Sequence, residues 1–468
     1  MLHRVQSGTG ITSEVGGRSH PIHWSRDAAI SSYRNKIRRL AQSIADGEWQ
    51  FGAVCDRLHR ALDGGPPEPA PLASRLLARF TPGRPPSRAQ LLVFLWQDEA
   101  LHQALSRSAD PALPRILLDP PVMQPPIEPF AQPLPELATL RDVQDWLGLS
   151  DRELAWLADR EGRQCRIEQP KLHHYRYHWI AKRAGGWRLI EQPKPRLKAI
   201  QRQILREILN GVPAHPCAHG FRRGRSCKTY VEPHLVKAAV LRLDLQDFFT
   251  SVPPPRIGAL FRRLGYPVAV AQVLQGLCSH ASSLHLAAPP QGALDWEQRK
   301  RLQSKHLPQG APSSPALANL CAWRLDCRLQ GLARHLGLDY TRYADDLALS
   351  GGRQLLGMLP FLRARICAIA LEEGFRINQR KTRLMTQARR QSLTGIVINR
   401  RPGLRRDEFD RLRATLYNCA RFGPDSQNRQ GLADFRAHLH GRVAHAAWLD
   451  PAKATRLYRL WEQIRWPT

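Results

Sequence analysis

The chain has 468 residues and a formal net charge of +30 at pH 7. Its length exceeds what one ordinary hydrophobic core serves, so we expect at least two domains, and its excess of Lys and Arg predicts a polyanionic partner, with nucleic acid first. The nine cysteines include no Cys-x-x-Cys pair, which argues against a disulfide framework. No apolar run reaches the length of a membrane span, so we expect a cytoplasmic protein without membrane contact.

Residues 1–110 have the pattern of a small helical module. Apolar residues recur at three- and four-residue steps from Tyr33 to Ile44, which predicts an amphipathic helix beginning near Ser25. A second helix is expected after Ser87, a suitable N-cap. Its apolar face would be Leu91, Leu92, Leu95 and Trp96. The pattern leaves three roles open: an RNA clamp, a dock for an effector protein, or a self-association surface.

Proline is dense over residues 111–135, and because Pro lacks the N–H that helices and sheets need, we expect an extended linker there. Two short helices should follow, separated at Gly148, with Ser150 capping the second.

From about residue 176, strand patterns alternate with helices, which predicts an α+β domain. "RYHWIAKRAGGWRLIEQP" (176–193) indicates a hairpin that turns at Gly-Gly, and residues 194–212 form an amphipathic basic pattern. "VLRLDLQDFFTSV" (240–252) predicts a strand that ends in an acidic turn at Asp244. After about residue 400 the pattern is helical and basic, with an apolar stripe of Leu457, Leu460, Trp461 and Ile464.

Two like charges stand side by side in "YTRYADDLALS" (340–350), at Asp345 and Asp346. A solvated turn is the simple interpretation, because Asp is common in turns. The alternative is a metal site, since adjacent carboxylates repel each other unless cations bind them and hard oxygen ligands suit Mg²⁺. With Asp244 at a second strand end, these carboxylates could hold the two Mg²⁺ ions that in-line phosphoryl transfer uses.

The order of motifs resembles that of bacterial retron-type reverse transcriptases. It runs through "LDLQDFF" (243–249), "LPQGAPSSP" (307–315), "YADD" (343–346), "GFRINQRKTRLM" (374–385) and "LTGIVIN" (393–399). Upstream, "GGWRLIEQPKPRLKAIQRQIL" (185–205) and "AHGFRRGRS" (218–226) resemble the fingers motifs of the same family. The resemblance covers about residues 140–468. It implies a right-hand polymerase, with fingers and an antiparallel-sheet palm over 136–395 and a helical basic thumb over 396–468.

The resemblance also implies the chemistry of individual residues. Asp244, Asp345 and Asp346 would be the ligands of two Mg²⁺ ions. Lys381 lies in the segment where polymerases of this class can place an acid that protonates pyrophosphate, although a solvated Lys is an equal alternative.

Four further residues would contact the incoming dNTP by resemblance. Arg188 would contact the triphosphate, unless it is only a surface charge of the hairpin. Phe249 would lie under the sugar and clash with a 2′-hydroxyl, the alternative being core packing. Gln309 would brace the sugar side of the nucleotide, and Gly310 would allow close backbone approach.

Template or RNA contacts are expected from two basic groups. One is the basic turn with Arg222, Arg223 and Arg225; the other is Arg456 and Arg459 in the last helix. Ordinary surface charge is the alternative for any one of these side chains.

The chain departs from the family pattern in two motifs and in its length. Retron enzymes usually carry Asn-Ala-x-x-His before the first catalytic strand, and here "YVEPH" retains His234 without the Asn-Ala. They also usually carry Val-Thr-Gly after the hairpin, where this chain has Leu393-Thr394-Gly395. The first 135 residues exceed the minimal family length.

The function implied is RNA-directed DNA synthesis. A retron enzyme would bind a structured non-coding RNA, prime from a 2′-hydroxyl within it, and make a small single-stranded DNA joined to RNA. Such systems often act in phage defence with an effector protein. Two alternatives stay open: a defence-type reverse transcriptase without a branched RNA primer, and a catalytically idle RNA-binding scaffold. The three intact Asp residues argue against the scaffold.

Overall fold

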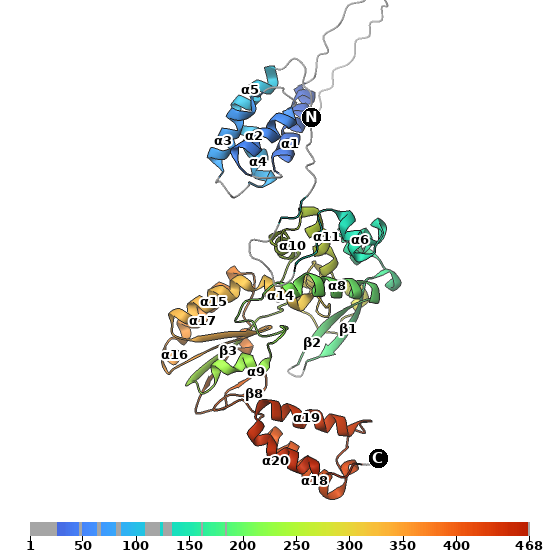
Figure 1. Cartoon of the computed structure of the whole chain (residues 1–468), viewed down its shortest axis with the longest axis vertical. Coiled ribbons are helices and arrows are strands. Elements are labelled where there is room, and N and C mark those ends of the chain that lie inside the picture. The colour runs from blue at the N-terminus through green and yellow to red at the C-terminus, as the bar shows by residue number, and fades with distance from the viewer. Residues whose placement is uncertain are drawn as a thin grey trace, which may run out of the picture. The chain divides into compact units, whose positions relative to one another are not determined.

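The computed structural model describes residues 26–45, 49–62, 67–80, 86–107, 122–124, 133–160, 162–182 and 185–466. The chain forms two compact units, residues 1–121 and 122–468 (Figure 1). Within the described ranges, no helix combines the length and apolar character needed to cross a membrane.

The first unit is helical, as expected. Its helices are α1 (Arg26–Ala45), α2 (Phe51–Leu62), α3 (Pro69–Arg79), α4 (Arg88–Gln97) and α5 (Glu99–Arg107). The predicted face of α1 is buried at Ile37, Leu40 and Ile44, and Ser87 caps α4 through a reciprocal capping box with Gln90. The unit therefore has its own apolar core. Most of the Pro-rich segment 111–135 lies outside the described residues.

The second unit begins with the two short helices predicted. They are α6 (Leu140–Leu147) and α7 (Asp151–Ala158). Gly148 ends α6 at φ +60°, a conformation that Gly adopts without steric cost, and Ser150 caps α7. The predicted hairpin follows as β1 (Tyr175–Ala181) and β2 (Trp187–Pro193), and the basic helix as α8 (Pro195–Glu207).

A four-stranded antiparallel sheet is the centre of the second unit. Its strands are β3 (Ala239–Asp244), β4 (Asp339–Tyr343), β5 (Asp346–Gly351) and β6 (Arg383–Thr386), in the order β4-β5-β3-β6. Alternate side chains point to opposite faces. Leu241, Leu243, Leu347 and Leu349 join the main core, whereas Val240 and Ala348 pack in a smaller cluster with Tyr230 and Leu393. The unit is therefore α+β, as predicted.

Helices and short strands complete the two faces of the sheet. The main-core side has α10 (Pro254–Arg263), α11 (Val268–Cys278), α14 (Ser314–Cys321), α15 (Trp323–His335), α16 (Gln354–Gly357) and α17 (Leu359–Glu372). The smaller cluster involves α9 (Cys227–Val231), β7 (Ser392–Leu393) and β8 (Ile396–Val397).

Buried polar contacts fix the β4–β5 hairpin. The Arg342 guanidinium and the Asp326 carboxylate are both fully buried and lie 2.6 Å apart. Arg342 also donates to the carbonyl of Ala344, the turn residue, which has φ +56°. His234, retained from the family motif, is buried between the hydroxyls of Thr341 and Ser350 at 2.7 Å each. Burial lowers the pKa of His234 to about 3, so its ring is neutral and links β4 to β5 through these two hydrogen bonds.

The C-terminal helices pack around a separate core. They are α18 (Arg406–Phe422), α19 (Phe435–Leu449) and α20 (Pro451–Glu462). The predicted stripe is buried at Leu457 and Ile464 and partly buried at Leu460 and Trp461. Lys228 of α9 donates to the carbonyl of Trp448 at 2.9 Å, which ties these helices to the sheet side of the unit.

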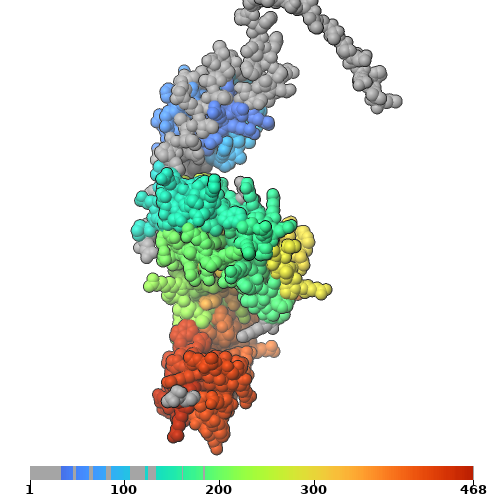
Figure 2. Space-filling model, turned by 90° about the vertical axis from the view of Figure 1, so that its right-hand side faces the viewer, coloured from blue at the N-terminus to red at the C-terminus, as the bar shows by residue number. Residues whose placement is uncertain are grey.

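One segment was not anticipated from the sequence pattern. Between α11 and the loop at 307–310 the chain forms α12 (Leu284–Ala287) and α13 (Trp296–Gln303). Figure 2 shows this segment, in yellow, projecting beside the green residues of the hairpin. Leu302 and Ala287 pack against Leu189 of β2 in a small apolar cluster. The segment is therefore held against the hairpin by apolar contacts.

Candidate active site

A cavity of about 320 Å³ opens at the ends of β3 and the β4–β5 hairpin. Hairpin β1–β2, the turn after β3, α13 and the 307–310 loop also contribute to its lining. Residues predicted from separate motifs meet there: Asp244, Asp345, Lys381, Arg188, Phe249 and Gln309. Segments far apart in the sequence thus converge on one concave site, which is the usual setting of a binding or active site.

The acidic residues are each engaged differently. Lys381 donates from Nζ to both carboxylate oxygens of Asp244, at 2.9 and 3.0 Å. Arg242, two residues earlier on β3, makes a bidentate pair with Asp346 at 2.7 and 2.9 Å. Asp346 does not line the cavity, whereas Asp244 and Asp345 do. Arg242 was not singled out from the sequence. The only sign of its role is that it lies two residues before Asp244, on the same face of the strand.

Asp345 is the carboxylate whose pKa is raised by both of its acidic neighbours. Burial raises its pKa above the ordinary value, and the neighbouring Asp244 and Asp346 carboxylates raise it further. The pKa of Asp346 is also raised by burial, although Arg242 opposes that shift. Oxygen donors that repel one another in this way suit a hard divalent cation.

No group of three or more His, Cys, Asp or Glu in the described part of the chain is arranged to hold a metal ion. Two of the three carboxylates at this site pair with cations instead: Asp244 with Lys381 and Asp346 with Arg242. By the chemistry of their oxygen donors, Asp244 and Asp345, which both face the cavity, still fit a divalent cation.

Phe249 lies in the tight turn that follows β3. Its half-buried ring packs near Phe248 and Phe221, with ring centroids 5.6 and 6.1 Å away. Phe249 contributes to the cavity wall and also packs against the main core. Core packing and a contact with the sugar are thus compatible for this residue.

The Gln309–Gly310 loop is held against β2 by Glu191. The Gln309 backbone N–H donates to the Glu191 carboxylate at 3.1 Å, and the Glu191 N–H donates to the Gln309 carbonyl at 2.9 Å. Gly310 has φ +138°, and a Cβ there would lie 2.8 Å from the Glu191 carbonyl oxygen. Only Gly allows this approach of the loop to the hairpin.

Glu191 is itself fully buried, and it accepts hydrogen bonds from Ser282 Oγ at 2.6 Å and His306 Nε2 at 3.1 Å. Burial alone would raise the pKa of Glu191, but His306 and the hydrogen bonds lower it to about 2. The Glu191 carboxylate in turn raises the pKa of His306 despite burial. Glu191, which also lines the cavity, and His306 therefore form a buried ion pair.

The predicted template contacts lie outside the cavity. Arg223 and Arg225 are exposed in the turn before α9, and Arg222 donates to the His215 carbonyl at 3.2 Å. Arg456 and Arg459 are exposed on α20. These two groups are therefore accessible to a polyanion, and they are separate from the residues that line the nucleotide-sized cavity.

Several lining residues were missed from sequence. Lys182, Gln298 and Asn378 face the same cavity. Lys182 had a signal, as a cation in the hairpin beside Arg188, but Gln298 had none because its helix was not predicted. Glu191 could have been noticed as an acidic residue inside an apolar strand pattern.

Comparison with known proteins agrees with this geometry. Residues 180–398 match the family model described as reverse transcriptase (RNA-dependent DNA polymerase). The chain is 39% identical to the Retron Mx65 reverse transcriptase of Myxococcus xanthus over 337 residues, which is 70% of this chain and 72% of that protein. It is 34% identical to the Retron Mx162 reverse transcriptase of the same organism over 346 residues, covering 69% and 66% of the two chains.

A relative from another organism agrees. The Retron Ec86 reverse transcriptase of Escherichia coli is 34% identical over 247 residues, which is 52% of this chain and 69% of that protein. Enzymes of the reverse transcriptase family generally use divalent metal ions, which accords with the carboxylates of the cavity. The matched motifs, the convergent cavity and these relatives lead to one conclusion: the chain belongs to the retron reverse transcriptases and is an RNA-directed DNA polymerase.

Proposed function

We propose that this chain copies a cognate structured non-coding RNA into a small single-stranded DNA that stays joined to RNA, starting from a 2′-hydroxyl of that RNA. The observation that carries the proposal is the convergence of Asp244, Asp345 and Lys381 with Arg188, Phe249 and Gln309 on one cavity. The cavity lining includes both carboxylates and cations, which suits metal-bound phosphates and a primer hydroxyl.

In this proposal the second unit is a right-hand polymerase. Residues 136–395 would be fingers and palm, with the β1–β2 hairpin in the fingers and the four-stranded sheet in the palm. Residues 396–468 would be the thumb, residues 111–135 a linker and residues 1–110 a separate module. The exposed Arg456 and Arg459 on α20 would contact the template–primer duplex or the RNA, and Arg222, Arg223 and Arg225 the template phosphates.

Two Mg²⁺ ions bound by Asp244 and Asp345, with Asp346 as a third carboxylate, would activate the primer hydroxyl and neutralise the leaving pyrophosphate. The protein's own residues do the positioning. Arg188 and Lys182, both exposed on the hairpin beside the cavity, would hold the triphosphate.

The remaining residues select the substrate and complete the reaction. Phe249 would close the space that a 2′-hydroxyl needs, and Gln309, which also lines the cavity, would brace the sugar side of the nucleotide. Lys381 now binds Asp244, but it borders the same cavity and can turn to the pyrophosphate oxygen and donate a proton.

The test is made on nucleic acid that copurifies with the protein. The chain is expressed with its native flanking DNA, purified, and the bound material treated separately with RNase and DNase. We expect a discrete DNA covalently joined to RNA, absent from the Asp345→Asn/Asp346→Asn variant. If the bound DNA carries no RNA branch, the enzyme uses a primer other than a 2′-hydroxyl of the RNA. If both samples contain RNA but no DNA, the chain is better described as a catalytically idle RNA-binding scaffold.

We also propose that the DNA–RNA product acts in phage defence with an effector protein. This part rests on the family resemblance, and residues 1–110, which belong to the first compact unit, would be the part that binds such a partner. Plaque assays with the native locus, the Asp345→Asn variant and a deletion of neighbouring genes would test it. Equal phage titres in all three strains would refute a defence role.

A further inference from the structure

Helix α13 and the turn after β3 form neighbouring parts of the cavity wall. Leu294, Gln298 and Leu302 belong to the α13 segment, and Gln246 to Thr250 belong to the turn. The turn contains Phe249, whereas α13 contacts the hairpin through Leu302. The spacing between these two parts therefore sets the width of the cavity near Phe249.

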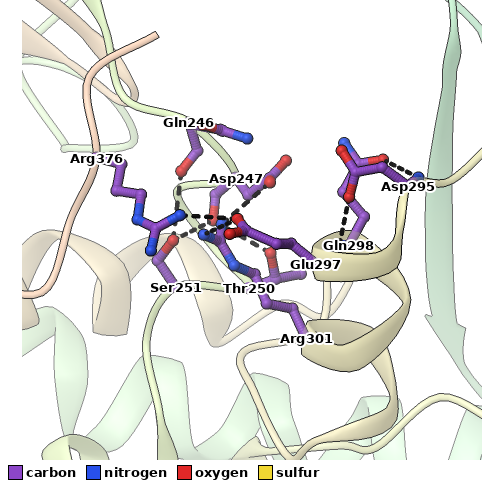
Figure 3. A network of polar contacts seen from close by, with 9 residues as sticks. All are labelled: Gln246, Asp247, Thr250, Ser251, Asp295, Glu297, Gln298, Arg301 and Arg376. Carbon is purple, nitrogen blue, oxygen red and sulfur yellow. Dashed lines mark hydrogen bonds and ion pairs between the residues drawn. The ribbon is translucent and has the colours of Figure 1, made fainter.

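A chain of alternating charges joins the two parts (Figure 3). Arg301 of α13 donates to the Asp247 carboxylate of the turn at 3.1 Å. Glu297, one helical turn before Arg301, accepts from Arg376 at 2.7 Å and lies 3.6 Å from Arg301. Helix α13 thus contributes one charge to the contact with Asp247 of the turn and one to the contact with Arg376, which lies between α17 and β6. We call Asp247, Glu297, Arg301 and Arg376 the α13 clasp.

Within the α13 clasp, the contact with Asp247 is the better protected. The side chains of Arg301 and Asp247 are 22% and 24% exposed, whereas those of Arg376 and Glu297 are 52% and 49% exposed. Water and salt screen the outer pair strongly, so it contributes little on its own. The inner pair, Arg301–Asp247, is therefore the contact whose loss should change the position of the turn.

Asp247 is also the residue that shapes the turn. It has φ +50°, a left-handed conformation that Asp and Asn tolerate better than most side chains. Its carbonyl accepts from the Ser251 N–H and Ser251 Oγ at 2.9 Å each, and from Thr250 Oγ1 at 3.2 Å. Phe249 lies inside this hydrogen-bonded loop, so a shift of Asp247 moves the ring of Phe249 with it.

We infer that Arg301, acting through Asp247, is a positioning residue for sugar selection. By holding the turn at a fixed distance from α13, it keeps Phe249 close enough to exclude a 2′-hydroxyl. Arg301 does not line the cavity, so it acts on the nucleotide only through the turn. The inference rests on the proposed role of Phe249. It adds that the Arg301–Asp247 contact sets how strongly a dNTP is preferred over an rNTP.

The experiment compares incorporation of one dNTP and the matching rNTP opposite the same template base, with the full-length chain. Arg301→Gln is expected to lower the ratio of kcat/KM for dNTP to that for rNTP roughly fivefold, the loss expected for one half-buried ion pair. Asp247→Asn, which keeps a residue suited to φ +50°, should lower it similarly. The double variant should match either single variant, because both remove the same contact. Arg301→Lys should restore part of the ratio.

Two comparisons make the result decisive. Arg299→Gln changes an exposed Arg on the same helix and should leave the ratio unchanged. Phe249→Ala tests the proposed function itself, and it should lower the ratio by more than Arg301→Gln does. If Phe249→Ala lowers the ratio and Arg301→Gln lowers both kcat/KM values equally, the clasp has no part in selection. If Phe249→Ala leaves the ratio intact while Arg301→Gln lowers it, the proposed role of Phe249 fails, and with it the inference that Arg301 acts through Phe249.

Discussion

Asp244 and Asp346 stand directly opposite each other across strands β3 and β5, yet different cations hold their carboxylates. Lys381 binds Asp244 and Arg242 binds Asp346. Like charges placed opposite each other in an antiparallel pair are destabilising, and these two cations offset that repulsion. Lys381 is 55% exposed, whereas Arg242 is 35% exposed and bidentate. Asp244 is therefore the carboxylate that is more readily released to another cation.

Asp345 and Asp346 of the β4–β5 hairpin should differ in how much activity is lost when each is neutralised. Asp345→Asn should lower kcat/KM for dNTP incorporation by on the order of 10³, because Asp345 faces the cavity and is proposed to bind the catalytic cations. Asp346→Asn should cost less, because Arg242 already neutralises much of that charge. Single-turnover incorporation on a primed RNA template measures both. Equal losses would mean that Asp346 leaves Arg242 during the reaction.

Lys381 is expected to act in the chemical step. Lys381→Leu should lower the single-turnover rate by about 10²-fold, the usual contribution of a positioned general acid. The KM for dNTP should change little, because the primary contact of Lys381 in this structure is Asp244. Arg380→Leu, next in sequence and exposed, is the matched control. A large rise in KM with an unchanged rate would instead make Lys381 a triphosphate contact.

The buried Glu191–His306 pair should stabilise the fold over a limited pH range. The pKa of Glu191 is lowered from 4.5 to about 2, so its contribution is complete above 4.5 and is lost as pH falls toward 2. The pKa of His306 is raised above 6.5, so its contribution is complete below 6.5 and is lost as pH rises through the raised value. His280, also packed against Glu191, stays neutral because burial lowers its pKa to about 3.

Glu191→Gln should therefore reduce the free energy of unfolding by about 3–5 kcal/mol near pH 6 and flatten its dependence on pH. Urea unfolding at several pH values measures this. The variant should also raise the KM for dNTP, because Glu191 holds the backbone of Gln309. Glu168→Gln, at an exposed position, should change neither quantity. Stability that does not change between wild type and Glu191→Gln would exclude the ion pair.

The arginines of α20 should contribute to RNA affinity through phosphate contacts. Replacing Arg456 and Arg459 by Gln should weaken RNA binding and reduce the slope of log K against log salt by about 2, one for each lost phosphate contact. Filter binding at several KCl concentrations measures the slope. Arg141→Gln on α6, also exposed, should leave it unchanged. An unaltered slope in the α20 variant would show that RNA does not reach this face.

The sequence by itself determined the family, the α+β class and the main catalytic candidates. Motif order, strand alternation and caps such as Ser87 and Ser150 are local signals, and the chemistry of paired carboxylates depends only on residue type. For the same reason the sequence predicted the amphipathic helix near Ser25, which begins at Arg26, and the hairpin that turns at Gly185–Gly186.

Only the tertiary structure decided which of these residues act together. It separated Asp346 from the cavity by pairing it with Arg242, and it placed α13 beside a turn more than forty residues earlier in the chain, through Arg301 and Asp247. It also made Glu191 a brace for Gln309. None of these contacts produces a periodic pattern in the sequence. Each joins residues of elements that come together only in the folded protein. Their strength depends on burial, which a local stretch of sequence does not specify.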